Sequence, residues 1–140
     1  MSRIIIIAII GLCLLMSCEN SHNNSSKELV QQAKERAKEV VIQSLVDKDG
    51  AELMTPTIEF ESNDVVVLQA KLNARNSFGG KSQTTIEYIL TSTGKERLIN
   101  LGNGKSVVHA AKITVPDSLY YTPQFDSIVQ KNILDLMDWY

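Results

Sequence analysis

The stretch Val-Val-Val-Leu-Gln-Ala-Lys-Leu-Asn-Ala-Arg, from Val65 to Arg75, decides the fold. Apolar and polar residues alternate along it, as they do in a β-strand that buries one face of its sheet. One face carries Val66, Leu68, Ala70, Leu72 and Ala74. The opposite face carries Gln69, Lys71, Asn73 and Arg75. The pattern therefore predicts a strand of an antiparallel sheet that is covered on one side only.

Similar segments on both sides of this stretch predict a meander of about five strands. Residues 57–61 alternate, with Ile58 and Phe60 on one face, and a Ser-Asn-Asp turn follows them. After the central strand, residues 82–91 place Thr84, Ile86, Tyr88 and Leu90 on one face. A turn at Gly94 leads to a strand at 97–101, and a turn at 102–104 leads to a last strand at 106–115.

Two amphipathic helices are predicted beside this sheet. The first begins at Ser25, which has capping-box spacing with Glu28, and it ends at a turn at 47–50. The second begins at Thr122, a good N-cap, with Pro123 at the first helical position. The stripe of the first helix comprises Val30, Ala33, Ala37, Val40, Val41, Ser44 and Leu45. The stripe of the second helix comprises Phe125, Ile128, Val129, Ile133, Leu136, Met137 and Tyr140. We expect a single two-layer α+β domain at 27–140: an N-terminal helix, the meander, and a C-terminal helix packed on one face.

Residues 1–17 have the pattern of a secretory signal. Arg3 supplies one positive charge before an apolar run at 4–16, which is too short to span a bilayer. The run ends in Leu15-Met16-Ser17-Cys18, which resembles the lipobox of bacterial lipoproteins. That resemblance implies that a signal peptidase removes residues 1–17. It also implies that the thiol of Cys18 carries a lipid, which anchors the chain in a membrane.

The N-terminal segment leaves two alternatives open. Cys13 is a rival lipid acceptor, but the bulky Leu12 precedes it where a small residue is wanted. A plain cleaved signal with a chance cysteine is the other alternative. With Cys18 lipidated, residues 18–26 are a flexible polar tether, and His22 is a solvated residue within it. The domain is then expected outside the cytoplasm in a bacterial cell envelope, on the outer membrane in preference to the inner one.

The hairpin after the central strand carries the most distinctive local segment, Asn73-Ala74-Arg75-Asn76-Ser77-Phe78-Gly79-Gly80. It resembles a hairpin of small uncharacterised bacterial proteins, many of them exported or lipid-anchored, whose domain runs helix, strand, strand, strand. The resemblance covers about 40–90 and implies a fold but no activity. This chain departs from the family pattern at 47–49, at 68–69 and at Lys81.

The tip of that hairpin predicts either a demanding turn or a binding site. The paired glycines permit positive φ, and Asn76 tolerates the left-handed region. Phe78 is a core residue if it folds back onto the sheet and an apolar anchor if it is exposed. Lys81 and Arg75 flank the tip, and they either attract an anionic partner or are simply solvated charges beside a turn. The candidate binding residues are Arg75, Asn76, Ser77, Phe78, Gly79 and Gly80.

Composition and motifs exclude several classes of protein. The formal net charge is −2 and only two of the 140 residues are Cys, which disfavours nucleic-acid binding and a disulfide scaffold. No phosphate loop, zinc spacing or nucleophile elbow occurs, and the turn at 47–50 lacks the register of a calcium loop. His109 is expected as a buried or edge-strand residue, and Glu59 and Glu61 as exposed charges on one strand face. We therefore expect no cofactor, no metal and no enzymatic activity.

Two non-enzymatic functions agree with these observations, and a third hypothesis, an enzyme, ranks behind them. The first is a non-enzymatic, lipid-anchored protein-binding or assembly module that presents the hairpin tip to another envelope protein. The alternative is a small-molecule carrier with a pocket between the sheet and the C-terminal helix. In that pocket Tyr88, Tyr120, Tyr121 or Trp139 meets the ligand. The third is a weak hydrolase that depends on His109.

Overall fold

The computed structural model describes residues 21–45, 48–75, 78–102 and 104–139. The predicted signal peptide at 1–17, Cys13 and Cys18, and the tip residues Asn76 and Ser77 lie outside these ranges. The described elements follow in the order α2 (Ser21–Ser44), β1 (Glu52–Leu53), β2 (Thr57–Glu61), β3 (Val65–Arg75), β4 (Lys81–Thr91), β5 (Glu96–Asn100), α3 (Val107–Ile113), the 3₁₀ helix η1 (Asp117–Leu119) and α4 (Phe125–Met137).

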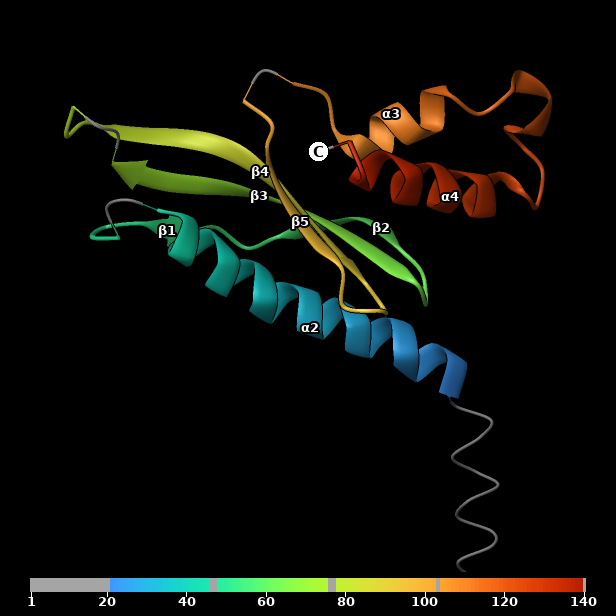
Figure 1. Ribbon diagram of the computed structural model, residues 1–140, viewed down its shortest axis with the longest axis horizontal. Coiled ribbons are helices and arrows are strands. Elements are labelled where there is room, and N and C mark those ends of the chain that lie inside the picture. Colours follow the sequence, from blue (N-terminus) through green and yellow to red (C-terminus); the bar gives the residue numbers. More distant parts are fainter. Residues whose placement is uncertain (1–20, 46–47, 76–77, 103, 140) are drawn as a thin grey trace, which may run out of the picture.

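The predicted α+β class is confirmed, with an N-terminal helix, an antiparallel sheet of five strands and C-terminal helices. The prediction of a sheet covered on one side is wrong, because α2 lies on one face while α3 and α4 lie on the other (Figure 1). β3 explains the difference. Val65, Val66, Val67 and Leu68 are four consecutive buried residues, so both faces of the strand are apolar at its start.

The strands pair in the order β1-β3-β4-β5, and β2 also pairs with β3. β1 pairs with the end of β3, through Glu52 and Leu53, whereas β2 pairs with its first half. A bulge in β2 puts Ile58 and Phe60 opposite the successive residues 68 and 67 of β3. The two side chains therefore do not share a face as predicted: Phe60 packs against the α3–α4 core, and Ile58 is 43% exposed.

Helix α2 packs its apolar stripe along one face of the sheet. Its buried residues contact the alternate residues of β3 and β4: Leu29, Val30, Ala33 and Ala37 pack with Val66, Leu68, Tyr88 and Leu90. The helix begins at Ser21 and not at Ser25, so residues 21–26 of the predicted tether are helical. Ser25 does not act as the N-cap, because its Oγ donates a hydrogen bond to Oδ1 of Asn63 in the β2–β3 turn (3.0 Å).

The predicted strand at 106–115 is wrong, because this segment forms α3. The Ser106 side chain accepts hydrogen bonds from the N–H groups of Val108 and His109, which caps the helix. Val107, Val108 and Ala111 are the buried residues, at helical spacing. His109 is accordingly an exposed helix residue and not a buried or edge-strand one.

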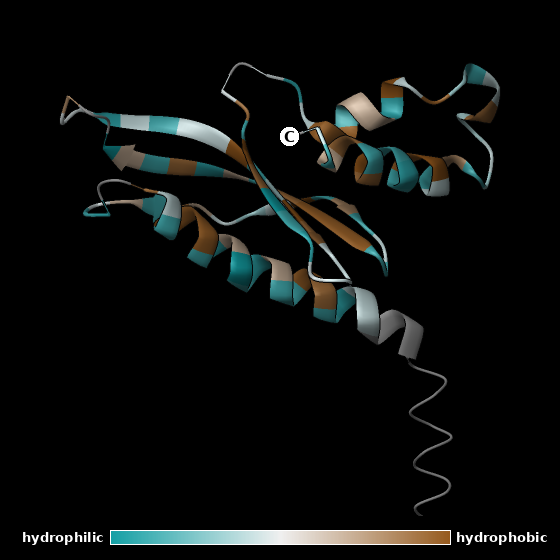
Figure 2. Ribbon diagram, viewed as in Figure 1, coloured by the Kyte–Doolittle hydropathy of each residue, from teal (hydrophilic) through white to brown (hydrophobic). Residues whose placement is uncertain are grey.

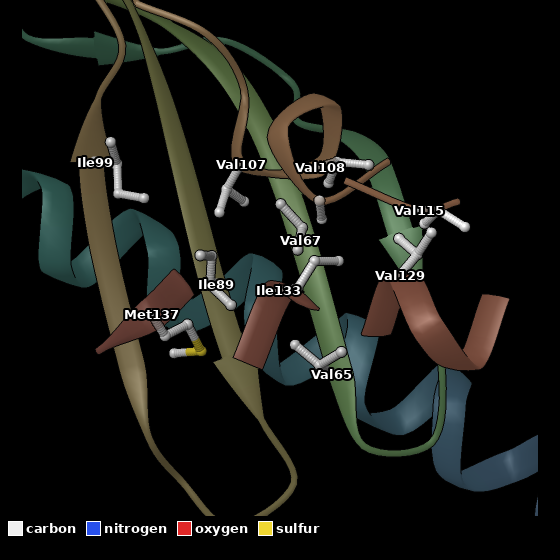
Figure 3. Packing of buried hydrophobic residues seen from close by; sticks show 11 residues of the cluster. Val65, Val67, Ile89, Ile99, Val107, Val108, Val115, Val129, Ile133 and Met137 are labelled. Carbon is white, nitrogen blue, oxygen red and sulfur yellow. The ribbon is translucent and has the colours of Figure 1, made fainter. Parts of the chain in front are cut away.

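Helix α4 completes the second apolar layer. It begins at Phe125, with Gln124 at the N-cap, and Thr122 instead donates its hydroxyl to the carbonyl of Leu119 (2.8 Å). Its buried residues Val129, Ile133 and Met137 face the sheet (Figure 3). The cluster on this face comprises Val65, Val67, Ile89, Ile99, Val107, Val108, Ala111, Val115, Val129, Ile133 and Met137. Seven residues of β3, β4 and the helices are fully inaccessible in it, which makes this interface the main source of stability on that side.

Candidate binding site at the hairpin tip

The β3–β4 hairpin extends beyond the part of the sheet that helices cover on both faces. β3 and β4 are 11 residues each and pair along their whole length, ending at Arg75 opposite Lys81. On one face, the end of α2 follows the hairpin, and Val41 packs with Leu72. On the other face, α3 and α4 cover the half that contains Val65. We call residues 71–75 and 78–85 the distal hairpin, and Figure 1 shows it reaching away from α3 and α4.

Phe78 lies at the tip of the distal hairpin and is 95% exposed. Of the two positions that the sequence left open, the structure therefore places Phe78 outside the core. Gly79 has a φ of +80°, a region that residues with a Cβ rarely adopt, so the turn also needs a glycine there. Asn76 and Ser77, the other predicted tip residues, lie outside the described residues.

Positive charge gathers on one face of the distal hairpin. Arg75 and Lys81 are register partners, so their side chains leave the same face at neighbouring positions. Both are exposed, and neither forms an ion pair with a described residue. Lys71 lies on the same face further from the tip. Residues 71–81 contain no Asp or Glu, although the whole chain has 16 acidic against 14 basic residues.

A groove of about 280 Å³ adjoins this pair of cations. Its lining includes Asn73, Lys81 and Gln83, together with one carboxylate, that of Glu52. Gln83 Nε2 donates a hydrogen bond to Oδ1 of Asn73 (2.9 Å). The amide N–H₂ group of Asn73 therefore offers a donor to another molecule. Figure 2 shows the half of β4 nearest the tip as neutral to hydrophilic, whereas its other half is hydrophobic.

The four aromatic residues considered for a carrier pocket do not gather at one place, although the rings of Tyr120 and Tyr121 contact each other with centroids 6.3 Å apart. Tyr88 is buried on the α2 side of the sheet, and its hydroxyl donates to Oε2 of Glu96 (2.5 Å). Tyr120 packs against the core on the opposite side. Tyr121 is 99% exposed and Trp139 is 86% exposed. Tyr120 and Tyr121 line an open pocket of about 400 Å³ together with Ile113 and Asp117.

The space between α4 and the sheet is filled with side chains at its centre. Val129, Ile133 and Met137 are fully inaccessible to solvent there (Figure 3). At one end, an open depression of about 430 Å³ separates α4 from the β4–β5 turn, and its lining includes Lys95 and Asp138. None of the four aromatic residues lines this depression. This depression therefore lacks the aromatic lining that was predicted for a carrier pocket between the sheet and the C-terminal helix.

The residues weighed for catalysis are scattered. His109 is exposed on α3, and Glu59 lies at the β2 bulge, which separates it from Glu61. The Thr57 hydroxyl donates to Oε1 of Glu59 (3.2 Å). Within the described ranges, no group of three or more His, Cys, Asp and Glu side chains is placed to hold a metal ion.

Glu87 is a buried carboxyl that the sequence reasoning missed. It is fully inaccessible on the α3 side of the sheet, and its Oε1 accepts a hydrogen bond from the backbone N–H of Val107 (2.7 Å). Burial raises the pKa of Glu87, and the nearby Ser106 hydroxyl, Val107 N–H and Gln69 amide offset part of this effect. Because one carboxyl oxygen joins β4 to the first turn of α3, we assign Glu87 a structural role.

A second polar network joins α2 to the sheet. The Arg36 guanidinium contacts both carboxylate oxygens of Glu96, with Nη2 2.9 Å from Oε1. Arg36 and the Tyr88 hydroxyl together hold the pKa of Glu96 below its ordinary value. Arg36 and Glu96 also line a shallow pocket of about 430 Å³, together with Glu35 and Glu39.

The described helices include none that is both long and apolar enough to cross a membrane. The predicted signal peptide and lipidated Cys18 lie outside the described residues, so they stay predictions. Comparison with known proteins found no match to this chain among family models, curated proteins or solved structures.

Proposed function

We propose that this chain is a lipid-anchored protein of the bacterial cell envelope that binds another envelope protein through its hairpin tip. It acts as a non-enzymatic binding or assembly module. The lipid on Cys18 attaches the chain to the membrane, and the side chain of Phe78 inserts into an apolar pocket of the partner. The outer membrane is the expected location, with the domain outside the cytoplasm.

The exposure of Phe78 carries this proposal. A phenylalanine that is 95% exposed in the isolated chain leaves its ring in water, which costs hydrophobic free energy until a partner covers it. Aromatic side chains supply much of the binding energy at protein interfaces when a pocket encloses them. The tip connects two paired 11-residue strands, and this regular hairpin fixes the position of the Phe78 backbone more precisely than a long loop would.

Helix α2 runs from the lipidated end of the chain toward the distal hairpin, which supports a binding role for the hairpin tip at a distance from the membrane. The start of α2 packs near Val66 and Leu90, and its end packs near Leu72 and Ala74 of the distal hairpin. A helix of 24 residues is about 36 Å long, at roughly 1.5 Å per residue. Cys18 precedes the helix by only three positions, so the anchor lies at one end of α2 and the tip beyond the other.

Crosslinking in intact cells tests the binding site. A photoreactive residue replaces Phe78, Tyr121 or Glu35 in separate variants of the full chain. Tyr121 is the matched control, because it is an aromatic residue of similar exposure at another place. We expect a discrete adduct from position 78 alone. Equal adducts from 78 and 121, or none from 78 in a folded and membrane-bound chain, would overturn the proposed site.

Fractionation tests the anchor. Cys18→Ser should move the chain from the membrane fraction to the soluble fraction, and metabolic labelling with a palmitate analogue should be lost with it. Cys13→Ser is the control and should change neither result. A chain that stays in the membrane fraction after Cys18→Ser would contradict lipidation at this cysteine.

A further inference from the structure

We infer that the partner docks an acidic segment on the face of the distal hairpin that carries Arg75 and Lys81. This inference rests on the proposed function and adds the chemistry of the partner. It starts from an unfavourable arrangement in the isolated chain. Residues directly opposite each other in an antiparallel pair have neighbouring side chains, and like charges at such positions destabilise the sheet.

Nothing in the described chain neutralises this pair. Neither cation takes part in an ion pair there, whereas Arg36, Lys95 and Lys131 each have a carboxylate partner. Lys71 adds a third positive charge to the same face. A ligand with two or more carboxylates would relieve the repulsion on binding, and its ion pairs would lose solvent at the interface.

The groove beside the pair adds hydrogen-bond donors of the kind that carboxylates accept. Asn73 offers its amide N–H₂ group, and the Lys81 ammonium lines the same groove. Glu52 also lines the groove and opposes an anion there. Because the Glu52 carboxylate repels an acidic segment, removing its charge should strengthen binding of that segment.

Phe78 favours a protein partner over a free anion. An exposed aromatic ring next to paired cations matches an acidic segment that also offers an apolar pocket, because small anions give the ring nothing to contact. An anionic membrane surface is the rival source of negative charge. The position of the tip, beyond the end of α2 that is furthest from the anchor, disfavours the membrane that holds Cys18.

A binding measurement tests the acidic partner directly. The full chain, purified in mild detergent, is titrated into a fluorescent peptide of alternating glutamate and leucine, and fluorescence anisotropy is recorded. The same peptide with lysine for glutamate is the charge control. We expect Arg75→Gln/Lys81→Gln to weaken binding roughly tenfold or more, and Glu52→Gln to strengthen it. Lys38→Gln/Lys105→Gln removes the same charge from exposed positions elsewhere and should leave the affinity unchanged.

Three outcomes overturn the inference. The first is an affinity for the acidic peptide that Arg75→Gln/Lys81→Gln does not lower, while thermal unfolding shows the variant to be folded. The second is equal binding of the lysine peptide. The third is displacement of the acidic peptide by mixed micelles of phosphatidylglycerol but not by neutral micelles, which would assign the site to a lipid. Inorganic phosphate is added in a separate titration, and displacement of the acidic peptide by it would show that any phosphate group competes for the site, and not a lipid in particular.

Crosslinking separates failure of this inference from failure of the proposed function. An adduct from position 78 that persists unchanged in the Arg75→Gln/Lys81→Gln background would keep the tip as an interface and reject the acidic segment. If position 78 gives no adduct while peptide binding depends on both cations, the proposed partner at the tip is rejected and the anion site stands. Loss of both signals in the double variant supports both proposals.

Discussion

Glu87 makes stability depend on pH. Burial raises its pKa, so the folded chain disfavours the charged form more than the unfolded chain does. The wild-type chain therefore loses stability as the pH rises from the ordinary carboxyl value through the raised one, and it keeps that stability at lower pH. Glu87→Gln removes this titration. We expect the free energy of unfolding of the variant, relative to wild type, to increase over that interval and then to level off.

Urea unfolding at a series of pH values from about 4 to about 8 measures this difference. Glu61→Gln is the control for loss of one carboxylate, because Glu61 is exposed. A difference between Glu87→Gln and wild type that stays constant with pH would contradict the pKa shift. A variant that is less stable at every pH would show that the bond to Val107 outweighs the cost of burial.

Phe78 should contribute little to folding. Because its ring is 95% exposed, Phe78→Ala is expected to change the free energy of unfolding by no more than about 0.5 kcal/mol. Ile133 is fully inaccessible between α4 and the sheet, so Ile133→Ala should cost roughly 2–5 kcal/mol. Chemical denaturation of both variants makes the comparison. A cost near that of Ile133→Ala would identify Phe78 as a core residue and reject the binding site.

The distal hairpin should gain stability when its cross-strand repulsion is reversed. Arg75→Glu places an acidic side chain opposite Lys81, and opposite charges at such positions stabilise a sheet by roughly 0.2–1 kcal/mol. We expect a higher midpoint of thermal unfolding at low salt and a smaller gain at high salt. Lys105→Glu changes the same charge in a loop and is the control. A lower midpoint for Arg75→Glu would show that the two cations do not repel each other.

Elements with one clear period were predictable from the sequence. The strands at 57–61, 65–75 and 81–91 alternate over part of their length, and turn residues separate them from one another and from the strand at 96–100. The segment 106–115 was predicted wrongly because its apolar residues fit both periods. Val108 and Ala110 have the spacing of a strand face, whereas Val107, Val108 and Ala111 have the spacing of a helix face. Ser106 at the N-cap was a second signal that favoured the helix. β1 has two residues and depends on β3 for its pairing, so no local pattern marks it.

The candidate site was predictable in part. The paired glycines marked the turn, and the residue types of Arg75 and Lys81 were visible in the sequence. Their position directly opposite each other depends on the register of β3 and β4, which the structure supplies. The exposure of Phe78 depends on where α3 and α4 end over the sheet. Glu87 was missed because its partner is the backbone N–H of Val107, a contact between residues far apart in the chain.

At the scale of the whole molecule, hydrogen bonds connect the start of α2 to both other layers. Ser25 donates to Asn63, and Gln130 of α4 donates to the carboxylate of Asp64 in the same β2–β3 turn (3.0 Å for each bond). The turn therefore joins α2, the sheet and α4 at the end of the molecule that is nearest the proposed anchor. The distal hairpin lies at the opposite end (Figure 1).

This arrangement predicts how the molecule stands on its membrane. If Cys18 carries the lipid and residues 1–17 are removed, the mature chain has no free thiol, so one introduced cysteine can be labelled selectively. A fluorophore at Asn63→Cys should be quenched by spin-labelled lipid headgroups, because Asn63 contacts the first turns of α2. The same fluorophore at Phe78→Cys should be quenched several-fold less, since the roughly 36 Å length of α2 separates the tip from the anchor. Equal quenching at both positions would mean that the tip lies on the same membrane, and Phe78 would then be a lipid contact and not the anchor for a protein partner.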